Sequence, residues 1–98
     1  MEVTKMREKE VEQKLVKAVK SAKGICLKFT SPGVDGVPDR LVLMPFGKMA
    51  FVEVKAPGKK PRPLQIKRMK QLSALGFQCY VLDDIEKIGG MLDEIQSS

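Results

Sequence analysis

The stretch GVPDRLVLMPFGKMAFVEVKAPG, residues 36–58, is the most apolar part of this chain and constrains its fold most strongly. Two runs of strand-forming residues, 39–45 and 48–55, flank the dipeptide Phe46-Gly47. A three-residue loop containing this dipeptide predicts a hairpin with a type I turn closed by a left-handed glycine. A two-residue loop is the alternative, and it would shift the strand pairing.

The three-residue loop determines which side chains face each other across the hairpin. Cross-strand partners then have residue numbers that sum to 92, so Leu41 lies opposite Phe51 and Asp39 opposite Glu53. Because side chains alternate faces along a strand, Lys55 lies on the same face as Glu53. The two-residue loop would instead place Asp39 on the opposite face. The longer loop therefore predicts two carboxylates and an ammonium at the open end of the hairpin.

Two carboxylates at cross-strand distance repel each other unless a cation lies between them. Lys55 alone would make this a structural ion cluster. A divalent cation is the other interpretation, because Mg²⁺ takes oxygen ligands and usually accepts one or two protein carboxylates with waters and substrate phosphates. The chain contains no histidine, which removes His general bases and His-ligated zinc. Any catalysis here must therefore use carboxylates and lysine, with or without an oxygen-preferring metal.

Positive charge is concentrated directly after this cluster. The formal net charge is +6, and residues 55–70 contain seven Lys or Arg and no acid. Such a block favours a phosphate backbone as partner, although a solvated, solubilising loop is the alternative. The candidates for contacts with flanking phosphates are Lys59, Lys60, Arg62, Lys67 and Arg68.

The other elements follow from hydrophobic periodicity and turn residues. The sequence predicts one domain over residues 1–98, in the order αβββαβα. This order is typical of an α/β fold in which a mixed sheet is flanked by helices on both faces. The predicted elements outside the hairpin are a helix over 4–22, a strand over 25–30, a helix over 64–75, a strand over 77–82 and a helix from residue 84.

Polar residues on the helices point toward the same region. Glu8 precedes Val11 by three residues, which places it on the buried face of the first helix, and Glu12 lies near the same stripe. Gln65 stands four residues before Met69 on the second helix and is also expected to face inward. A partly exposed rim position is the alternative for each of them.

Further features bear on the compartment. The chain has no run of about 18 apolar residues and begins without the apolar core of a secretory signal. Cys26 and Cys79 are isolated, and we expect both to be buried free thiols. These features predict a reduced, cytoplasmic protein, in the host cytoplasm if a phage encodes it.

The motifs PDR at 38–40, ExKAPG at 53–58 and PxPLQ at 61–65 resemble the VRR-NUC (virus-type replication-repair nuclease) family of the PD-(D/E)xK nuclease superfamily. The resemblance covers nearly the whole chain and implies a restriction-endonuclease-like core in the stand-alone form found in phages and bacteria. It also implies a role for each matching residue: Asp39, Glu53 and Glu8 as metal ligands, Lys55 as the catalytic lysine and Gln65 as a further site residue.

The resemblance implies a metal-dependent DNA endonuclease using Mg²⁺ or Mn²⁺. Its expected substrate is branched DNA, such as four-way junctions or flaps, in replication, repair or recombination. The competing hypothesis is a non-catalytic nucleic-acid-binding module on the same fold, which would not need carboxylates facing a phosphate. A two-fold symmetric junction requires two sites, so we expect a homodimer. Its interface could be the edge strand or the C-terminal apolar stripe of Ile85, Ile88, Leu92 and Ile95.

Overall fold

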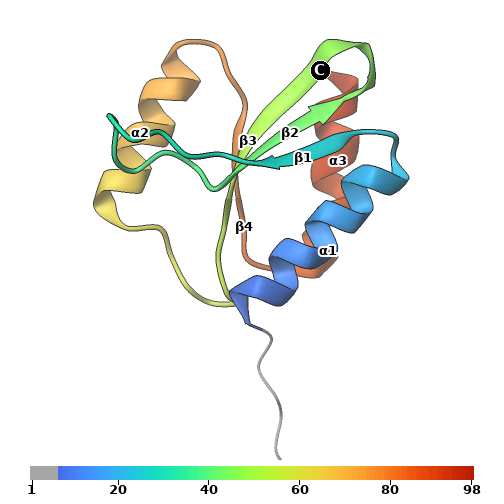
Figure 1. Ribbon diagram of the computed structural model, residues 1–98, viewed down its shortest axis with the longest axis horizontal. Coiled ribbons are helices and arrows are strands. Elements are labelled where there is room, and N and C mark those ends of the chain that lie inside the picture. The colour runs from blue at the N-terminus through green and yellow to red at the C-terminus, as the bar shows by residue number, and fades with distance from the viewer. Residues whose placement is uncertain (1–6) are drawn as a thin grey trace, which may run out of the picture.

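A computed structural model describes residues 7–98 and shows a four-stranded sheet with helices on both sides (Figure 1). The sheet order is β1-β2-β3-β4, with antiparallel pairing except for β4, which runs parallel to β3. The predicted αβββαβα order and mixed sheet are confirmed. The elements are α1 Glu8–Ser21, β1 Ile25–Lys28, β2 Arg40–Met44, β3 Lys48–Val54, α2 Pro63–Ala74, β4 Cys79–Leu82 and α3 Ile88–Ser97, with 3₁₀ turns at Pro45–Gly47 and Ile85–Lys87.

Several elements begin later than the sequence predicts. α1 begins at Glu8, and the predicted helical residues 4–6 lie outside the described part of the chain. β4 begins at Cys79 because the backbone N–H of Phe77 donates to the Leu72 carbonyl and closes the end of α2. A 3₁₀ turn precedes α3 because the Asp84 side chain accepts from a backbone N–H two residues later. These local hydrogen bonds replace helical or strand pairing at the element ends.

The hydrophobic core lies on the sheet face that α1 and α3 cover together, to the right of the sheet in Figure 1. α1 contributes the fully buried Val11, Leu15 and Val19, at helical spacing. The C-terminal apolar stripe packs into the same core, since three of its residues are buried and Ile85 packs against them. This stripe is therefore not a free interface, and that alternative for a dimer contact is wrong. Within residues 7–98 the structure contains no helix with the length and apolarity needed to cross a membrane.

The hairpin has the predicted three-residue loop and register. Leu41 pairs with Phe51, and the partner numbers sum to 92 along the whole ladder. The predicted type I turn is wrong, because Phe46 (φ 65°, ψ 27°) is left-handed as well as Gly47 (φ 73°). Two consecutive left-handed residues match the right-handed twist of the strands, as they do in the primed hairpin turns. The register survives because it depends on loop length rather than turn type.

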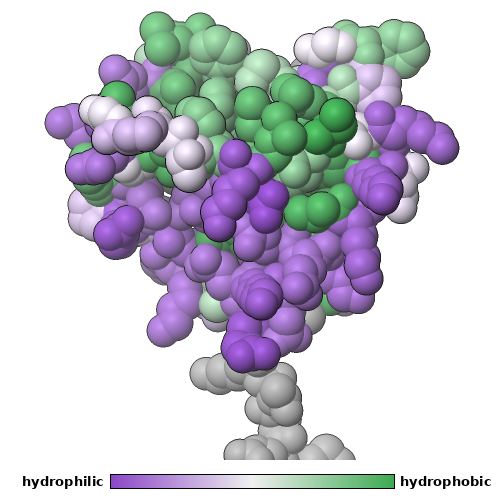
Figure 2. Space-filling model, viewed as in Figure 1, coloured by the Kyte–Doolittle hydropathy of each residue, from purple (hydrophilic) through white to green (hydrophobic). Residues whose placement is uncertain are grey.

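The opposite sheet face is covered by α2 alone, to the left in Figure 1, and only in part. Gln65 is the one residue of α2 that is buried. Hydrophobic residues consequently reach the surface over the upper half of the molecule, while hydrophilic residues occupy the lower half (Figure 2). We call the exposed apolar surface on the α2 side of the sheet the open sheet face. On and beside the strands it includes Ile25 at 58% exposed, Leu27 at 45% and Phe77 at 43%.

The two cysteines are free, as predicted, but neither is fully buried. Cys26 lies beside the core covered by α1, and Cys79 lies at the start of β4. Burial is the main reason that the pKa of each thiol is raised above its usual value. The half-buried positions follow from the edge location of β1 and β4, because an edge strand has a neighbour on one side only.

Candidate active site

Asp39 is the residue directly before β2, and both its main chain and its side chain are held in place. Its carbonyl accepts a 2.8 Å hydrogen bond from the Phe29 N–H, which extends the pairing of β1. Its Oδ2 accepts a 3.1 Å bond from the Val54 N–H at the end of β3. The carboxylate is therefore fixed at the open end of the hairpin, where the register predicts it.

Glu53 is the most buried charged group of the site, with 1% of its surface exposed. Its Oε2 accepts a 2.7 Å hydrogen bond from Gln65 Nε2 and lies 3.1 Å from Lys55 Nζ. Its Oε1 is buried and has no hydrogen-bond partner among residues 7–98. Burial first, and then the nearby charge of Asp39, raise the pKa of the Glu53 carboxyl above its usual value. One oxygen of this buried acid thus lacks a donor or cation among the residues that the structure describes.

Lys55 follows β3 directly, and its side chain is 15% exposed. Its backbone N–H donates to the Leu82 carbonyl at 2.9 Å, which continues the pairing with β4 beyond the strand end. The ammonium therefore points to the same face as Glu53, as the alternation of side chains predicts. The structure brings Asp39, Glu53 and Lys55 together at one corner of the sheet.

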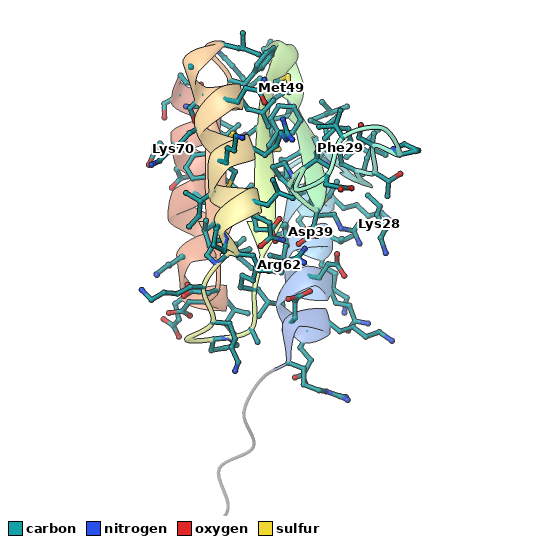
Figure 3. The ribbon with its side chains drawn as sticks, turned by 90° about the vertical axis from the view of Figure 1, so that its left-hand side faces the viewer. Lys28, Phe29, Asp39, Met49, Arg62 and Lys70 are labelled. Carbon is teal, nitrogen blue, oxygen red and sulfur yellow. The ribbon has the colours of Figure 1, made fainter. Side chains whose placement is uncertain are left out.

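Gln65 joins this corner from the first turn of α2, as its inward-facing position predicts. Its Oε1 accepts a 2.8 Å bond from the Arg62 N–H, which caps the helix, and its Nε2 is left to donate to Glu53. Figure 3 shows Asp39 and Arg62 at this lower end of α2. Because the amide can only donate from its nitrogen, Gln65 orients Glu53 and favours its ionised form.

Within residues 7–98 neither acidic candidate of α1 forms a hydrogen bond or ion pair with Asp39, Glu53 or Lys55, and the role of Glu8 as a metal ligand stays a prediction. Glu8 is exposed at the first residue of the helix, so its predicted inward position is wrong. The buried stripe begins at Val11, and the first turn of α1 lies at the lower end of the molecule (Figure 1). Glu12 is engaged elsewhere, with its Oε2 3.0 Å from Nε of Arg40 on the other sheet face. Across residues 7–98 no three His, Cys, Asp or Glu side chains form a ready metal cluster.

The predicted phosphate-binding residues divide into two groups. Lys59, Lys60, Arg62 and Lys67 are exposed, and the first three lie between β3 and α2 beside the acidic corner. Arg68 has a structural contact instead, because its Nε donates at 3.0 Å to a backbone carbonyl in the loop before β2. Sequence patterning could not separate these groups, since both lie in one continuous basic block.

Asp39 and Glu53 form a donor set that fits a divalent cation of the Mg²⁺ type. Both offer carboxylate oxygens, and two protein carboxylates are the usual number for such an ion. The unpaired Oε1 of Glu53 is the specific observation in favour of this fit, because a buried carboxylate oxygen is normally satisfied by a donor or a cation. Nitrogen and sulfur ligands, which zinc prefers, are not contributed by these two residues.

A mixed sheet that places an Asp, a Glu and a Lys at the end of its central hairpin is the arrangement that the resemblance to PD-(D/E)xK nucleases predicts. The chain is 54% identical over 78 residues to the "Putative nuclease p44" of Acyrthosiphon pisum secondary endosymbiont phage 1, covering 80% of this chain and 84% of that protein. A solved structure described as a VRR_NUC domain matches with a TM-score of 0.82 and 25% identity, covering 88% of this chain and 94% of the other. No family model matches the sequence.

The chain belongs to the VRR-NUC nuclease family, as its motifs indicate. Both comparisons cover most of each partner's length. The family places this chain among the nucleases, whose substrate is nucleic acid.

Proposed function

We propose that this chain is a metal-dependent DNA endonuclease that hydrolyses phosphodiester bonds at Asp39, Glu53 and Lys55, with branched DNA as its substrate. The observation that carries the proposal is the unpaired, buried Oε1 of Glu53 beside a second carboxylate and an ammonium. A purely structural ion cluster would satisfy that oxygen within the protein. A catalytic site leaves that oxygen free to bind a cation, which in turn can bind a substrate phosphate.

In this proposal Asp39 and Glu53 hold Mg²⁺ or Mn²⁺, which when bound supplies Lewis acidity toward a phosphoryl oxygen and lowers the pKa of water. Gln65 keeps Glu53 ionised and oriented through its 2.7 Å hydrogen bond. Lys55 is close enough to orient the attacking water or to stabilise negative charge that develops on the phosphate. Lys59, Lys60 and Arg62 hold flanking phosphates, which position the DNA without reading its sequence.

The substrate panel that tests this proposal contains four-way junctions, flaps, linear duplex and single strands, each incubated with Mg²⁺ or Mn²⁺ and resolved on gels. We expect junctions or flaps to be cut and linear duplex to be cut more slowly. A parent chain that cuts nothing with any divalent metal would end the proposal. Cleavage of single strands alone would remove the branched-DNA part of it.

Replacing Asp39 with asparagine is expected to weaken Mn²⁺ binding by about 10- to 100-fold, since the amide removes one anionic ligand from the site. Isothermal titration of Mn²⁺ into the parent and the variant measures this. Asp93→Asn is the matched control, because Asp93 is an exposed aspartate on α3. Equal Mn²⁺ affinity of parent and Asp39→Asn would show that Asp39 is not a ligand.

We also propose that the enzyme is a homodimer that pairs through the open sheet face. A junction with two-fold symmetry requires two cuts, which a symmetric pair of sites supplies. The C-terminal stripe is buried, whereas Ile25 and Leu27 on the edge strand β1 are exposed. Apolar side chains beside an unpaired strand edge favour association with a second copy.

The double substitution Ile25→Lys and Leu27→Lys is expected to convert the dimer to a monomer without unfolding it, because both side chains are already exposed. Light scattering at working concentration reads the mass, and circular dichroism checks the fold. Leu75→Lys is the control, since Leu75 is an equally apolar residue 68% exposed at the end of α2. A parent chain that is strictly monomeric with and without DNA would contradict the dimer.

A further inference from the structure

We propose that a pocket between α2 and β4 binds one unpaired nucleotide of the DNA strand that enters the active site. This inference rests on the proposed nuclease function and specifies its substrate. The pocket has a volume of about 660 Å³, within the usual range for small-ligand sites. Its lining combines an apolar floor of Ile66, Met69 and Val81 with a rim of lysines, among them Lys59, Lys60 and Lys70.

The pocket occupies a different side of α2 from the acidic corner. Ile66, Met69 and Lys70 follow the i, i+3, i+4 spacing of one helical stripe, and all three line the pocket. Gln65 instead points to Glu53, and Arg68 points to the loop before β2. Figure 3 shows Lys70 on the far side of the helix from Lys28 and the strand β1. Helix α2 therefore lies between the pocket and the loop before β2, but it does not lie between the pocket and β3, the strand that carries Glu53.

Two connections place the pocket next to the site. Val81 on the pocket floor is the strand partner of Glu53 in the parallel pair β3–β4. Adjacent strands lie about 4.8 Å apart, so the floor begins one strand away from the catalytic carboxylate. The loop that carries Lys59 and Lys60 begins directly after Lys55. A DNA strand whose phosphate lies next to Glu53 would therefore have this pocket beside its neighbouring nucleotide.

The chemistry of the lining suits a nucleotide. Its aliphatic and thioether side chains give a base or sugar an apolar surface to cover, and its lysines attract the attached phosphates. The acid in the lining, Asp83, is paired with Lys87 at 3.2 Å, so its repulsion of a phosphate is reduced. A base inside a duplex is covered by its stacked neighbours, and a concave pocket can accept only a base that has left the stack. Flaps and branch points provide such a base.

The test measures binding in Ca²⁺, which occupies oxygen sites without turnover, to a blunt duplex and to the same duplex with a short single-stranded flap. The variant Lys70→Gln removes a rim charge that is not part of the catalytic site and leaves the pair of Asp83 and Lys87 intact. We expect its affinity for the flap to fall at least about threefold and its salt slope to fall by about 0.7, the contribution of one single-strand phosphate contact. Affinity for the blunt duplex should stay within about twofold.

The matched control is Lys14→Gln, which removes the same charge from an exposed position on α1. An equal loss of flap affinity in this control would show general electrostatic attraction and overturn the pocket. A second variant, Met69→Ser, tests the floor, and it should weaken flap binding without changing the salt slope. Thermal melting confirms that each variant is folded.

A footprint on Cys79 gives a measurement that needs no pocket variant. Cys79 lines the pocket, whereas Cys26 lies beside the core on the other sheet face, so a Cys26→Ser chain reports on Cys79 alone. Single-stranded oligonucleotide should slow labelling of Cys79 by a thiol reagent at least about fivefold, and blunt duplex should not.

The outcomes separate this inference from the proposed function. If the parent cuts flaps while both pocket variants bind them normally and Cys79 stays unprotected, the pocket assignment is wrong and the nuclease remains. If the parent neither binds nor cuts DNA, both proposals fall together.

Discussion

Replacing Lys55 with alanine is expected to reduce cleavage by a factor on the order of 10²–10³, the usual effect of losing one charge-stabilising donor. DNA affinity in Ca²⁺ should stay within about twofold, because one lysine among many contributes a small share of the phosphate attraction. The Nζ of Lys55 lies 3.1 Å from Glu53 Oε2 at the acidic corner, and we propose that it acts on the reacting phosphate there. A group that acts in the transition state affects rate far more than binding.

The reciprocal variant replaces Lys59, Lys60 and Arg62 together with alanine. We expect weaker binding, with a salt dependence lower by about 0.9 unit of slope per lost duplex contact. These side chains are exposed in the loop before α2, so the fold should be unaffected. Gel cleavage in Mg²⁺ and fluorescence anisotropy in Ca²⁺ read the two effects separately. Cleavage by Lys55→Ala at the parent rate would remove Lys55 from the mechanism.

Replacing Glu53 with glutamine is expected to inactivate the enzyme and also to stabilise its metal-free form. Glu53 is 1% exposed, faces the charge of Asp39 and leaves Oε1 without a partner among residues 7–98. Burial and the charge of Asp39 raise the pKa of its carboxyl despite the opposing effect of Lys55. A neutral side chain of the same shape removes the cost of burying a charge and the repulsion from Asp39, so the free energy of unfolding without metal should rise. Cleavage should fall by a factor on the order of 10² or more.

Urea unfolding in the presence of a chelator measures the stability, with Glu86→Gln as the control on an exposed acid. Adding Mn²⁺ should then stabilise the parent more than Glu53→Gln, because a ligand stabilises only the state that binds it. A metal-free Glu53→Gln chain that is less stable than the parent would mean that the carboxylate serves the fold. The site would then be a structural ion cluster.

The sequence by itself determined how the two strands of the hairpin pair. Loop length and the alternation of side chains are local properties, so the hairpin register placed Asp39, Glu53 and Lys55 at one corner before any packing was known. Helical periodicity placed Gln65 inward for the same reason. The predicted turn type was wrong, but the strand pairing was still predicted correctly, because the pairing depends on the number of residues in the loop.

Only the tertiary structure decided which of the candidate residues are buried or contact another part of the protein. Glu8 has the correct spacing for a buried stripe, but it is exposed at the first residue of α1, one turn before the first buried side chain. Arg68 belongs to the basic block, but its Nε donates to a backbone carbonyl in the loop before β2 and so holds that loop near α2. From the sequence the C-terminal stripe fits a core or an interface equally well, and only the packing of α3 against the sheet shows that it belongs to the core. The physical reason is common to all three: periodicity determines which face a side chain occupies, and only packing determines what that face meets.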